Sequence, residues 1–239
     1  MMRPIDEHPS RRVFFHGSRI DYGCTNPGGR KVSPISLPIA PQWYHRFVRP
    51  KWFTQKYIHQ HIRSNFNLHH QVVLDFGSGT GANCPMVHPS YYLGVDPDAK
   101  RIEYARKLYP QHTFQVFDRK TFPVEDNSVD CILIIAVLHH IPSQEIAAYM
   151  SEFVRILKPD GRMIVMEPCI CKSKPICSWF MKKVDKGAYI RDEEGYLKLF
   201  PRHEFECSVL KRFHKCFLYH ELFFSARRKS CAYPRRRWL

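Results

Sequence analysis

With 239 residues, the chain is long enough for one sizeable α/β domain with short appendages and too short for two large domains. Its apolar fraction of 44% excludes wholesale disorder, and its longest apolar run, Cys131 to Leu138, is far shorter than the roughly 20 residues of a membrane span. The formal net charge of +15 lies outside residues 71–168, which carry 9 Lys/Arg against 12 Asp/Glu. Basic arms of this kind suit an anionic acceptor, nucleic acid or a membrane surface, and they equally suit plain solvent.

We predict that residues 1–42 form an irregular, basic leader. The first 40 residues contain five prolines and the turn sequence NPGG, with little periodicity. The opening sequence MMRPIDEHPSRR places charges where a signal peptide needs its apolar segment. The next segment, Trp43 to Ile62, is aromatic and basic, and the helical spacing of Phe53, Tyr57 and Ile58 predicts a helix near the mouth of the following domain.

Strands and helices alternate from Gln71 to Glu167. Between the strands, Ile102, Ala105 and Leu108 define one helical face, and Ser143 is expected to cap a second helix, which Lys158–Gly161 ends. The apolar runs that predict strands are Val72–Asp75, Tyr92–Val95, Thr113–Phe117, Val129–Ile135 and Arg162–Glu167. This alternation predicts a doubly wound parallel sheet.

The pattern changes after Pro168. Residues 168–188 form a polar and aromatic insertion, and Ile190–Phe200 predicts a short helix. Two further strands, Phe205–Phe213 and Cys216–Ala226, are separated only by His214 and Lys215. A tight hairpin cannot make a parallel crossover, so the last strand must run antiparallel. We therefore predict an α/β, Rossmann-like doubly wound sheet of seven strands, mostly parallel, in a domain of residues 43–229, followed by a basic tail at 230–239.

The cysteines indicate a reducing compartment. There are nine, an odd number without a regular framework, which does not suit a disulfide scaffold. Cys169, Cys171 and Cys177 come nearest to a metal cluster, but no C-x-x-C pair accompanies them, and we predict no metal site. Together with the lack of a membrane span, this predicts a cytoplasmic protein.

A glycine-rich turn, VVLDFGSGTGANCP, follows the first predicted strand. Gly77, Gly79 and Ala82 match G-x-G-x-x-A, the fingerprint of dinucleotide-binding enzymes. Asp75, Gly77, Gly79 and Gly81 equally match D-x-G-x-G-x-G, which suggests a different ligand. In both cases the glycines let the chain turn sharply and let a ligand approach the backbone.

Three aspartates, Asp75, Asp96 and Asp118, end three successive strands. The carboxyl ends of parallel strands line one crevice, so all three carboxylates can face one ligand, although each alone could be a helix cap. Asp96 stands where such a sheet places an acid that accepts hydrogen bonds from ribose hydroxyls. Asp75 would add negative charge beside a pyrophosphate, which counts against a dinucleotide and favours a ligand that is cationic there.

The sequence resembles the class I S-adenosylmethionine-dependent methyltransferases, especially the type 11 group. The matching segments are VVLDFGSGTG, LGVDPD, VFDRKTFPVEDNSVDCILIIAVLHHI and RILKPDGRMIVMEP, and the resemblance covers about residues 43–226 in the expected order. The predicted hairpin matches the antiparallel seventh strand that distinguishes this fold from dehydrogenases. The resemblance implies methyl transfer with S-adenosylmethionine as the cofactor.

The resemblance also assigns roles to positions at the carboxyl ends of the strands. Those that would hold the methionine portion of the cofactor are Asp75, Gly77, Ser78, Gly79 and Gly81. Asp96 would accept from both ribose hydroxyls and Pro97 would lie against the adenine, while Asp118 and the backbone of Arg119 would bind its edge. Ala136 and Val137 would line the cofactor near the transferred methyl group.

His139 and His140, beyond the fourth strand, are candidate bases if the acceptor must lose a proton, and packing is the alternative role. The segment IAVLHH lacks the D/N-P-P-Y motif of amino-methylating nucleic-acid enzymes. Pro168-Cys169 resembles cytosine-C5 enzymes, but the Pro-Cys that those enzymes carry after the fourth strand is absent, which argues against Cys169 as a nucleophile.

The leading prediction is a methyltransferase for a small-molecule acceptor. An RNA methyltransferase or RNA-binding module that uses the basic arms is the alternative, and a nicotinamide-dependent oxidoreductase is a third candidate. Aromatic residues that could close over an acceptor, or simply belong to the core, are Trp43, Tyr44, Trp52, Phe53, Trp179, Phe180 and Tyr189.

Overall fold

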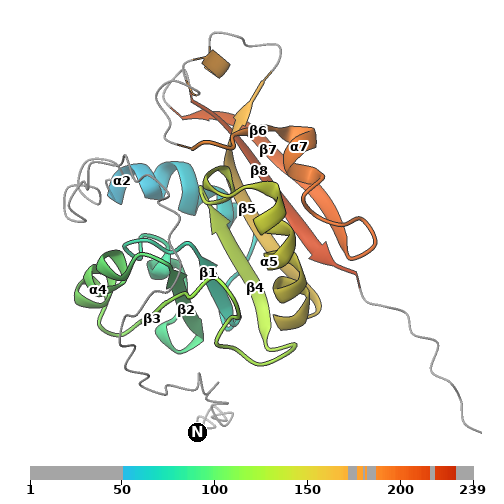
Figure 1. Ribbon diagram of the computed structural model, residues 1–239. Coiled ribbons are helices and arrows are strands. Elements are labelled where there is room, and N and C mark those ends of the chain that lie inside the picture. The colour runs from blue at the N-terminus through green and yellow to red at the C-terminus, as the bar shows by residue number, and fades with distance from the viewer. Residues whose placement is uncertain (1–50, 172–176, 180, 182–186, 216–218, 230–239) are drawn as a thin grey trace, which may run out of the picture.

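Eight strands form one mixed sheet within the part of the chain that the computed structural model describes, residues 51–171, 177–179, 181, 187–215 and 219–229 (Figure 1). The strands are β1 (Val73–Phe76), β2 (Tyr92–Asp96), β3 (Thr113–Val116), β4 (Val129–Ile135), β5 (Leu157–Ile170), β6 (Arg191–Asp192), β7 (Phe205–Lys215) and β8 (Tyr219–Arg228). Their order is β3-β2-β1-β4-β5-β8-β7, and the short β6 pairs with β5 outside this path.

The strand directions confirm the predicted fold. β1 to β5 pair in parallel, whereas β8 runs antiparallel to both β5 and β7. The sheet has one strand more than the seven predicted, because Arg191 and Asp192 pair with Cys169 and Ile170 at the end of β5. A two-residue strand leaves no periodicity in the sequence that could reveal it.

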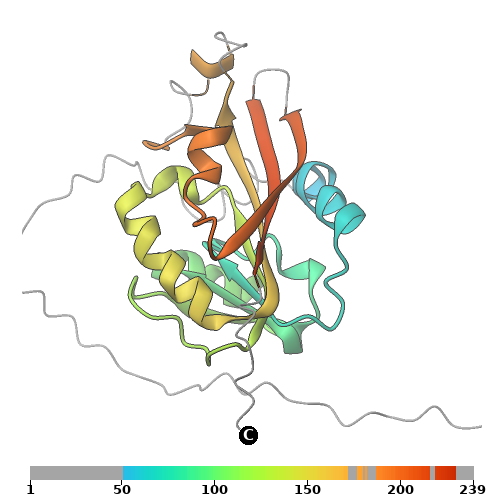
Figure 2. The ribbon, with the colours of Figure 1, turned by 90° about the vertical axis from the view of Figure 1, so that its right-hand side faces the viewer.

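Helices cover both faces of the sheet. α5 lies on one face and the N-terminal helical segment on the other (Figure 2). This segment, which we call the N-terminal helix, runs from residue 51 to residue 65 and includes one π-helical turn, Gln55–His59. The helices are α2 (Lys51–Thr54), α3 (Gln60–Asn65), α4 (Ala99–Leu108), α5 (Ser143–Ile156) and α7 (Glu193–Leu197), with short 3₁₀ turns at Cys84–Met86, Pro89–Tyr91 and Leu138–His140.

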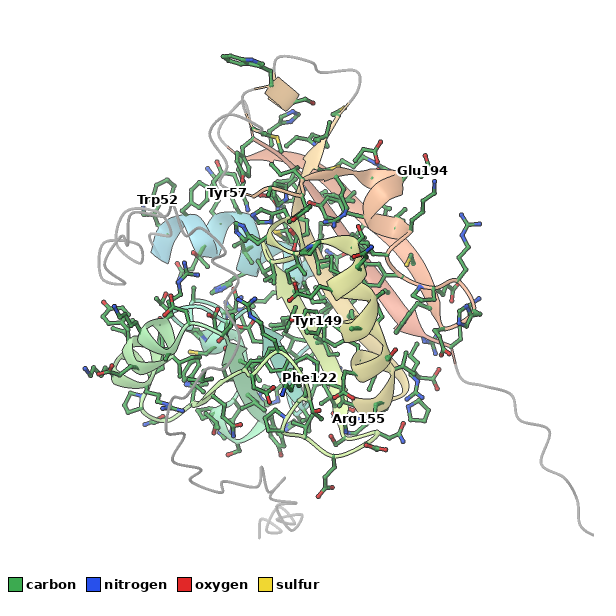
Figure 3. All side chains as sticks on the ribbon, in the orientation of Figure 1. Trp52, Tyr57, Phe122, Tyr149, Arg155 and Glu194 are labelled. Atoms are coloured by element: carbon green, nitrogen blue, oxygen red, sulfur yellow. The ribbon has the colours of Figure 1, made fainter. Side chains whose placement is uncertain are left out.

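Each face has its own apolar core. On the α5 side, the ring of Phe76 packs against Phe122 and Tyr149, with centroids 5.7 and 5.3 Å apart, inside the layer that Figure 3 shows between the sheet and α5. On the other side, Ile58 and Ile62 of the N-terminal helix belong to a second buried cluster. Because both faces are covered, the central parallel strands are apolar along their length, as their sequence indicated.

The C-terminal hairpin is longer than predicted. His214 and Lys215 were expected to form its turn, but they pair with His220 and Tyr219 and belong to β7, so that prediction is wrong. Lys215 is held in the strand by a buried ion pair with Glu221. An isolated basic residue in a sequence gives no sign of such a partner.

Three predicted boundaries also need correction. Ser143 does not cap α5, because the residue before the helix is Pro142 and the Ser143 hydroxyl accepts a hydrogen bond from Arg191. Lys158–Gly161, expected as a terminator only, lies within β5. The helix expected at 190–200 is reduced to α7. The side chain of Asp192 caps its first turn by accepting a hydrogen bond from the N–H of Gly195.

Several predictions lie outside the described residues. They include the leader at 1–42, the tail at 230–239, and the aromatic residues Trp43, Tyr44 and Phe180. Along the described residues, none of the helices combines the length and apolarity that crossing a bilayer requires.

Candidate functional site

The glycine-rich turn after β1 is held against β2 by backbone hydrogen bonds. The N–H groups of Gly77 and Ser78 both donate to the carbonyl of Val95, at 2.9 and 3.0 Å. Gly77 has a φ of +72°, and a Cβ placed there would lie 2.5 Å from a methyl group of Val137. The turn therefore requires glycine at this position for both its conformation and its packing.

At position 79, glycine is favoured by the backbone conformation alone and not by packing. Its φ is +55°, and a Cβ built there would meet nothing within 4 Å. Two buried polar atoms close to it in the chain, Ser78 Oγ and Asn83 Oδ1, have no hydrogen-bond partner. Open space beside unpaired polar atoms is what a bound polar ligand would fill, since buried polar groups are normally hydrogen-bonded.

Asp75 lies beneath the turn, with 1% of its surface exposed. Its carboxylate accepts a 2.7 Å hydrogen bond from the Tyr92 hydroxyl and longer bonds, 3.3 and 3.4 Å, from the Asn83 amide. Burial and the carboxylate of Asp75 raise the pKa of Tyr92 well above its usual range, so the phenol remains a donor. Asp75 thus connects β1, β2 and the residues after the glycines.

Asp96 ends β2 and joins the turn to the next strand. Its two oxygens accept one backbone hydrogen bond each, from Gly79 and from Asp98, both at 2.9 Å. Burial raises the pKa of Asp96, although those two hydrogen bonds oppose the shift. Each oxygen keeps a second lone pair for another donor. The neighbouring Pro97 is exposed.

Asp118 lies beyond the end of β3 and is exposed, and its carboxylate accepts a 2.9 Å hydrogen bond from the backbone of Lys120. Arg119 between them has a φ of +65°, which bends the chain away from the strand. The three aspartates therefore lie at the carboxyl ends of three neighbouring strands. Asp96 ends β2 as predicted, whereas Asp75 is one residue before the end of β1 and Asp118 two residues beyond β3, and only Asp75 and Asp96 are buried.

The chain after β4 turns at Ala136. This residue has a φ of +57°, and its N–H donates to the carbonyl of Met166 in β5 at 2.8 Å. The next residue, Val137, packs against Gly77, so the turn after β4 contacts the turn after β1.

Glu167, which sequence reasoning missed, organises the residues that follow. Its side chain is fully buried and accepts hydrogen bonds from the N–H groups of Val137 and Leu138, at 2.7 and 2.8 Å. A second oxygen lies 2.7 Å from Nδ1 of His139. The one available signal was an acid inside the apolar run of β5.

The two predicted bases have different environments. His139 is 3% exposed, and its contact with the carboxylate of Glu167 makes Nδ1 the protonated nitrogen. His140 is exposed, and its ring centroid lies 3.9 Å from that of His139. The structure therefore gives His139 an anchoring contact, whereas His140 faces solvent.

Glu221 is a further buried carboxylate at the same edge of the sheet. Glu221 in β8 is 1% exposed, and one of its oxygens bonds Lys215 at 2.6 Å while the other has no partner. Burial raises the pKa of Glu221, and the cation of Lys215 opposes that shift. Glu221 pairs with Pro168 across the sheet, so this ion pair lies level with the end of β5.

Residues 189–191 cross over the turn after β4. The N–H of Tyr189 donates to the carbonyl of His139 at 2.9 Å, and Arg191 donates to the carbonyls of Leu138 and Ile141, both at 2.9 Å. Of the aromatic residues proposed as a cover, Trp52 and Trp179 are more than half exposed. The cover over β4 thus consists of backbone and Arg191.

Cys169 does not have the properties of a nucleophile. It is buried, and burial raises the pKa of its thiol to about 12. The described residues hold no group of three or more His, Cys, Asp or Glu side chains placed to bind a metal ion.

The central part of the sequence matches a known domain. Residues 74–165 match a protein-family model described as a methyltransferase domain. The chain is similar to an uncharacterized methyltransferase-like protein of Schizosaccharomyces pombe, with 28% identity over 144 residues, 56% of this chain and 54% of that protein. It is also similar to the tRNA (carboxymethyluridine(34)-5-O)-methyltransferase of Macaca fascicularis, with 31% identity over 97 residues, 39% of this chain and 14% of that protein. The chain thus spans about half the length of the first relative and much less of the second.

Solved structures share the fold. The magnesium protoporphyrin IX methyltransferase of Synechocystis PCC 6803, solved with bound SAH, aligns with a TM-score of 0.57 at 18% identity, covering 75% of this chain and 83% of that one. A SAM-dependent methyltransferase of Aquifex aeolicus aligns with a TM-score of 0.58 at 16% identity, covering 77% and 97%. Both alignments extend beyond residues 74–165 to most of the described chain.

Proposed function

We propose that this chain, which belongs to the class I S-adenosylmethionine-dependent methyltransferases, transfers the methyl group of that cofactor to a small-molecule acceptor by in-line displacement. The observation that carries the proposal is the turn at Gly79. A Cβ built at Gly79 would meet nothing within 4 Å, the carboxylate of Asp96 is bonded to the Gly79 N–H, and the buried atoms Ser78 Oγ and Asn83 Oδ1 of the same loop have no hydrogen-bond partner.

The residues at this turn fit the cofactor. Ser78, Gly79 and Asn83 border the space for its methionine end, and the remaining lone pairs of Asp96 suit the two ribose hydroxyls. Asp75, beneath the turn, supplies negative charge on the side where the cofactor is cationic. Further out, the exposed residues Pro97, Asp118 and Arg119 would bind the adenine.

When bound, the cofactor supplies a sulfonium methyl that is already activated, so the protein needs mainly to position a nucleophile and exclude water. Ala136 and Val137 form the wall between the cofactor turn and the acceptor side. Glu167 holds that wall through the N–H groups of Val137 and Leu138. Residues 189–191 close the site above β4, which favours a small acceptor over a polymer.

We propose that His140 accepts the proton if the acceptor must lose one, because His140 is exposed whereas His139 is buried. The variant His140→Ala should lower the rate of methyl transfer at least about tenfold and leave the affinity for S-adenosylhomocysteine unchanged. His140→Gln, which cannot act as a base at neutral pH, is the matched control and should behave like the alanine variant. An unchanged rate in both would remove His140 from the mechanism.

RNA is the second candidate acceptor. Its support is the similarity to the tRNA (carboxymethyluridine(34)-5-O)-methyltransferase, which covers 39% of this chain. The buried thiol of Cys169 and the absence of a D/N-P-P-Y motif argue against two of the chemistries that nucleic-acid enzymes use. All six cysteines described by the structure are free, and we place the activity in the reducing cytoplasm.

Two experiments test the proposal. Titration calorimetry should show binding of S-adenosylhomocysteine and no comparable binding of NADH, and the reverse result would favour an oxidoreductase. A transfer assay with labelled S-adenosylmethionine, run separately on metabolite and RNA extracts, should label the metabolite fraction. Label in the RNA fraction alone would overturn the small-molecule acceptor and leave the methyltransferase activity standing.

A further inference from the structure

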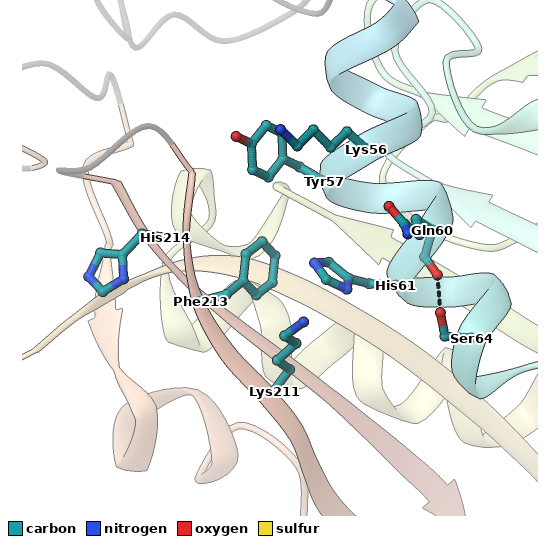
Figure 4. A pocket seen from close by; sticks show the side chains of 8 residues that line it. All are labelled: Lys56, Tyr57, Gln60, His61, Ser64, Lys211, Phe213 and His214. Atoms are coloured by element: carbon teal, nitrogen blue, oxygen red, sulfur yellow. Dashed lines mark hydrogen bonds between the residues drawn. The ribbon is translucent and has the colours of Figure 1, made fainter.

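A groove with a volume of about 440 Å³ lies between the N-terminal helix and β7 (Figure 4). This size falls within the range of about 300–1,000 Å³ that small-ligand sites occupy. The lining residues are Lys56, Tyr57, Gln60, His61 and Ser64 from the helix and Lys211, Phe213 and His214 from β7. None of them belongs to the residues that we assign to the cofactor.

The sequence spacing explains why these side chains meet. Lys56, Gln60 and Ser64 are four residues apart and lie on one helix face, while Ile58 and Ile62 on another face enter the core. In β7, Lys211 and Phe213 point to the same side of the sheet, because side chains alternate along a strand. β7 is the edge strand, so nothing in the described sheet lies beyond it.

The groove is positively charged. Lys56 and Lys211 are exposed, and among the described residues neither lies within ion-pair distance of a carboxylate. The described residues that line the groove include no acidic side chain. The nearby Lys215 adds little charge of its own, because it is buried against Glu221. An anion that enters here would therefore meet two ammonium groups that have no competing protein anion.

Aromatic rings separate the two lysines. The Nζ atom of Lys56 lies 5.4 Å from the ring centroid of Tyr57, and that of Lys211 lies 6.0 Å from the centroid of Phe213. The ring of His61 packs on Phe213 with centroids 4.4 Å apart. In Figure 4 the rings of Tyr57, His61 and Phe213 border the same space, whereas His214 lies on the far side of β7.

Two polar groups add hydrogen-bonding capacity. Burial lowers the pKa of His61, and the cations of Lys211 and Lys215 lower it further, so its imidazole is neutral and can both donate and accept. The side-chain amide of Gln60 is exposed, while the Ser64 hydroxyl is already bonded to the Gln60 carbonyl at 2.6 Å.

We propose that this groove binds a nucleotide unit, with its phosphate between Lys56 and Lys211 and its base against Tyr57 or Phe213. Cations beside partly exposed rings are the chemistry with which proteins hold single-stranded nucleic acid, because every base has a stacking face and every phosphate a charge. The same chemistry accepts a free nucleotide or one residue of a single-stranded RNA. The groove is independent of the methyl-transfer proposal, since its residues and its ligand are different.

The test is a binding experiment with the full chain. A fluorescein-labelled, single-stranded RNA of about 12 nucleotides is titrated and followed by anisotropy, with AMP and inorganic phosphate as competitors. The variant Lys56→Ala/Lys211→Ala should weaken RNA binding about tenfold and lower its salt dependence. The control Lys107→Ala/Lys198→Ala removes two exposed lysines that are paired with Glu103 and Glu194, and it should change binding less than about twofold.

Tyr57→Leu tests the aromatic contact while it keeps the apolar contact with the helix. Loss of a stacked base should weaken binding at least about fivefold. Competition by AMP would identify a free nucleotide as the ligand, and binding of RNA that AMP does not displace would identify the polymer. Absence of RNA and AMP binding, equal effects of the two lysine pairs, or no effect of Tyr57→Leu would each overturn the proposal. Affinity for S-adenosylhomocysteine should not change in any groove variant, so a failure of the methyl-transfer proposal remains distinguishable.

Discussion

The two halves of the sheet's carboxyl edge are stabilised in different ways. At β1 and β2, the glycine turn is held by backbone hydrogen bonds from Gly77 and Ser78 to Val95 and by the contact of Asp96 with Gly79. At β4, β5 and β8, the corresponding turns depend on buried side-chain charges. Both halves use partners from neighbouring strands. In the first half, backbone N–H groups of a glycine turn supply the donors and positive φ angles are needed, whereas in the second half the side chains of Glu167 and Glu221 are the buried partners.

The difference matters for function. The backbone half carries the predicted cofactor contacts, which need the same geometry whatever the acceptor is. The charged half lies on the side proposed for the acceptor, where Glu167 holds the turn after β4 through the N–H groups of Val137 and Leu138. Buried carboxylates are destabilising when they lose a partner, so this half should be the more sensitive to substitution.

Glu167→Ala should give the largest effect. It leaves the buried N–H groups of Val137 and Leu138 without an acceptor, and we expect the free energy of unfolding to fall by about 3–5 kcal/mol. Urea denaturation followed by circular dichroism measures this loss. Glu167→Gln keeps an accepting oxygen and should lose about half as much. A loss below about 1 kcal/mol in the alanine variant would remove the contrast between the two halves.

Lys215→Met should have the next largest effect. The substitution leaves Glu221 buried without a cation, and we expect a loss of about 3 kcal/mol in the free energy of unfolding. Adding Glu221→Leu to this variant should restore stability, because no unpaired charge then remains. Lys198→Met, which removes an exposed pair with Glu194, is the matched control and should change stability little. Equal losses at the two lysines would contradict a buried ion pair.

Gly77→Ala and Gly79→Ala sharpen the comparison from the backbone side. Both residues have a positive φ, but only at Gly77 would the new methyl group meet Val137, at 2.5 Å. We expect Gly77→Ala to lose about 2 kcal/mol of stability and Gly79→Ala about 1 kcal/mol. Gly79→Ala should nevertheless weaken binding of S-adenosylhomocysteine, since its methyl group enters the predicted cofactor space. Unchanged affinity in this variant, measured by calorimetry, would move the cofactor away from Gly79.

We expect the smallest effect on the free energy of unfolding from the ionisation of Asp96 as the pH changes. Its pKa is raised in the folded protein because of burial, so ionisation is harder in the folded than in the unfolded state. Its contribution to stability is therefore complete below its ordinary pKa of 3.8 and is lost as pH rises through the raised value. Relative to wild type, Asp96→Asn should gain stability over this interval, measured by urea denaturation at a series of pH values. A difference that does not vary with pH would contradict the raised pKa.

The local sequence was sufficient to predict the parallel part of the fold. β4 has the predicted bounds, and β1 and β2 agree within one residue, because fully buried strands are apolar along their length. The half-buried β3 also agrees within one residue. It also predicted the antiparallel direction of β8, since a hairpin allows no other direction. The turn of the hairpin and the cap of α5 were wrong, since Lys215 is paired with Glu221 across the hairpin and Ser143 with the distant Arg191.

By itself, the sequence determined the domain family, the order of the elements and the glycine turn, all of which depend on residues close together in the chain. Only the tertiary structure decided that His139 is bound to Glu167, that Glu221 is buried against Lys215, and that Lys56 and Lys211 face one groove. These contacts join residues from separate elements. Whether a charged side chain is anchored, buried or free to bind a ligand depends on what the fold places beside it, and no spacing along the chain encodes that.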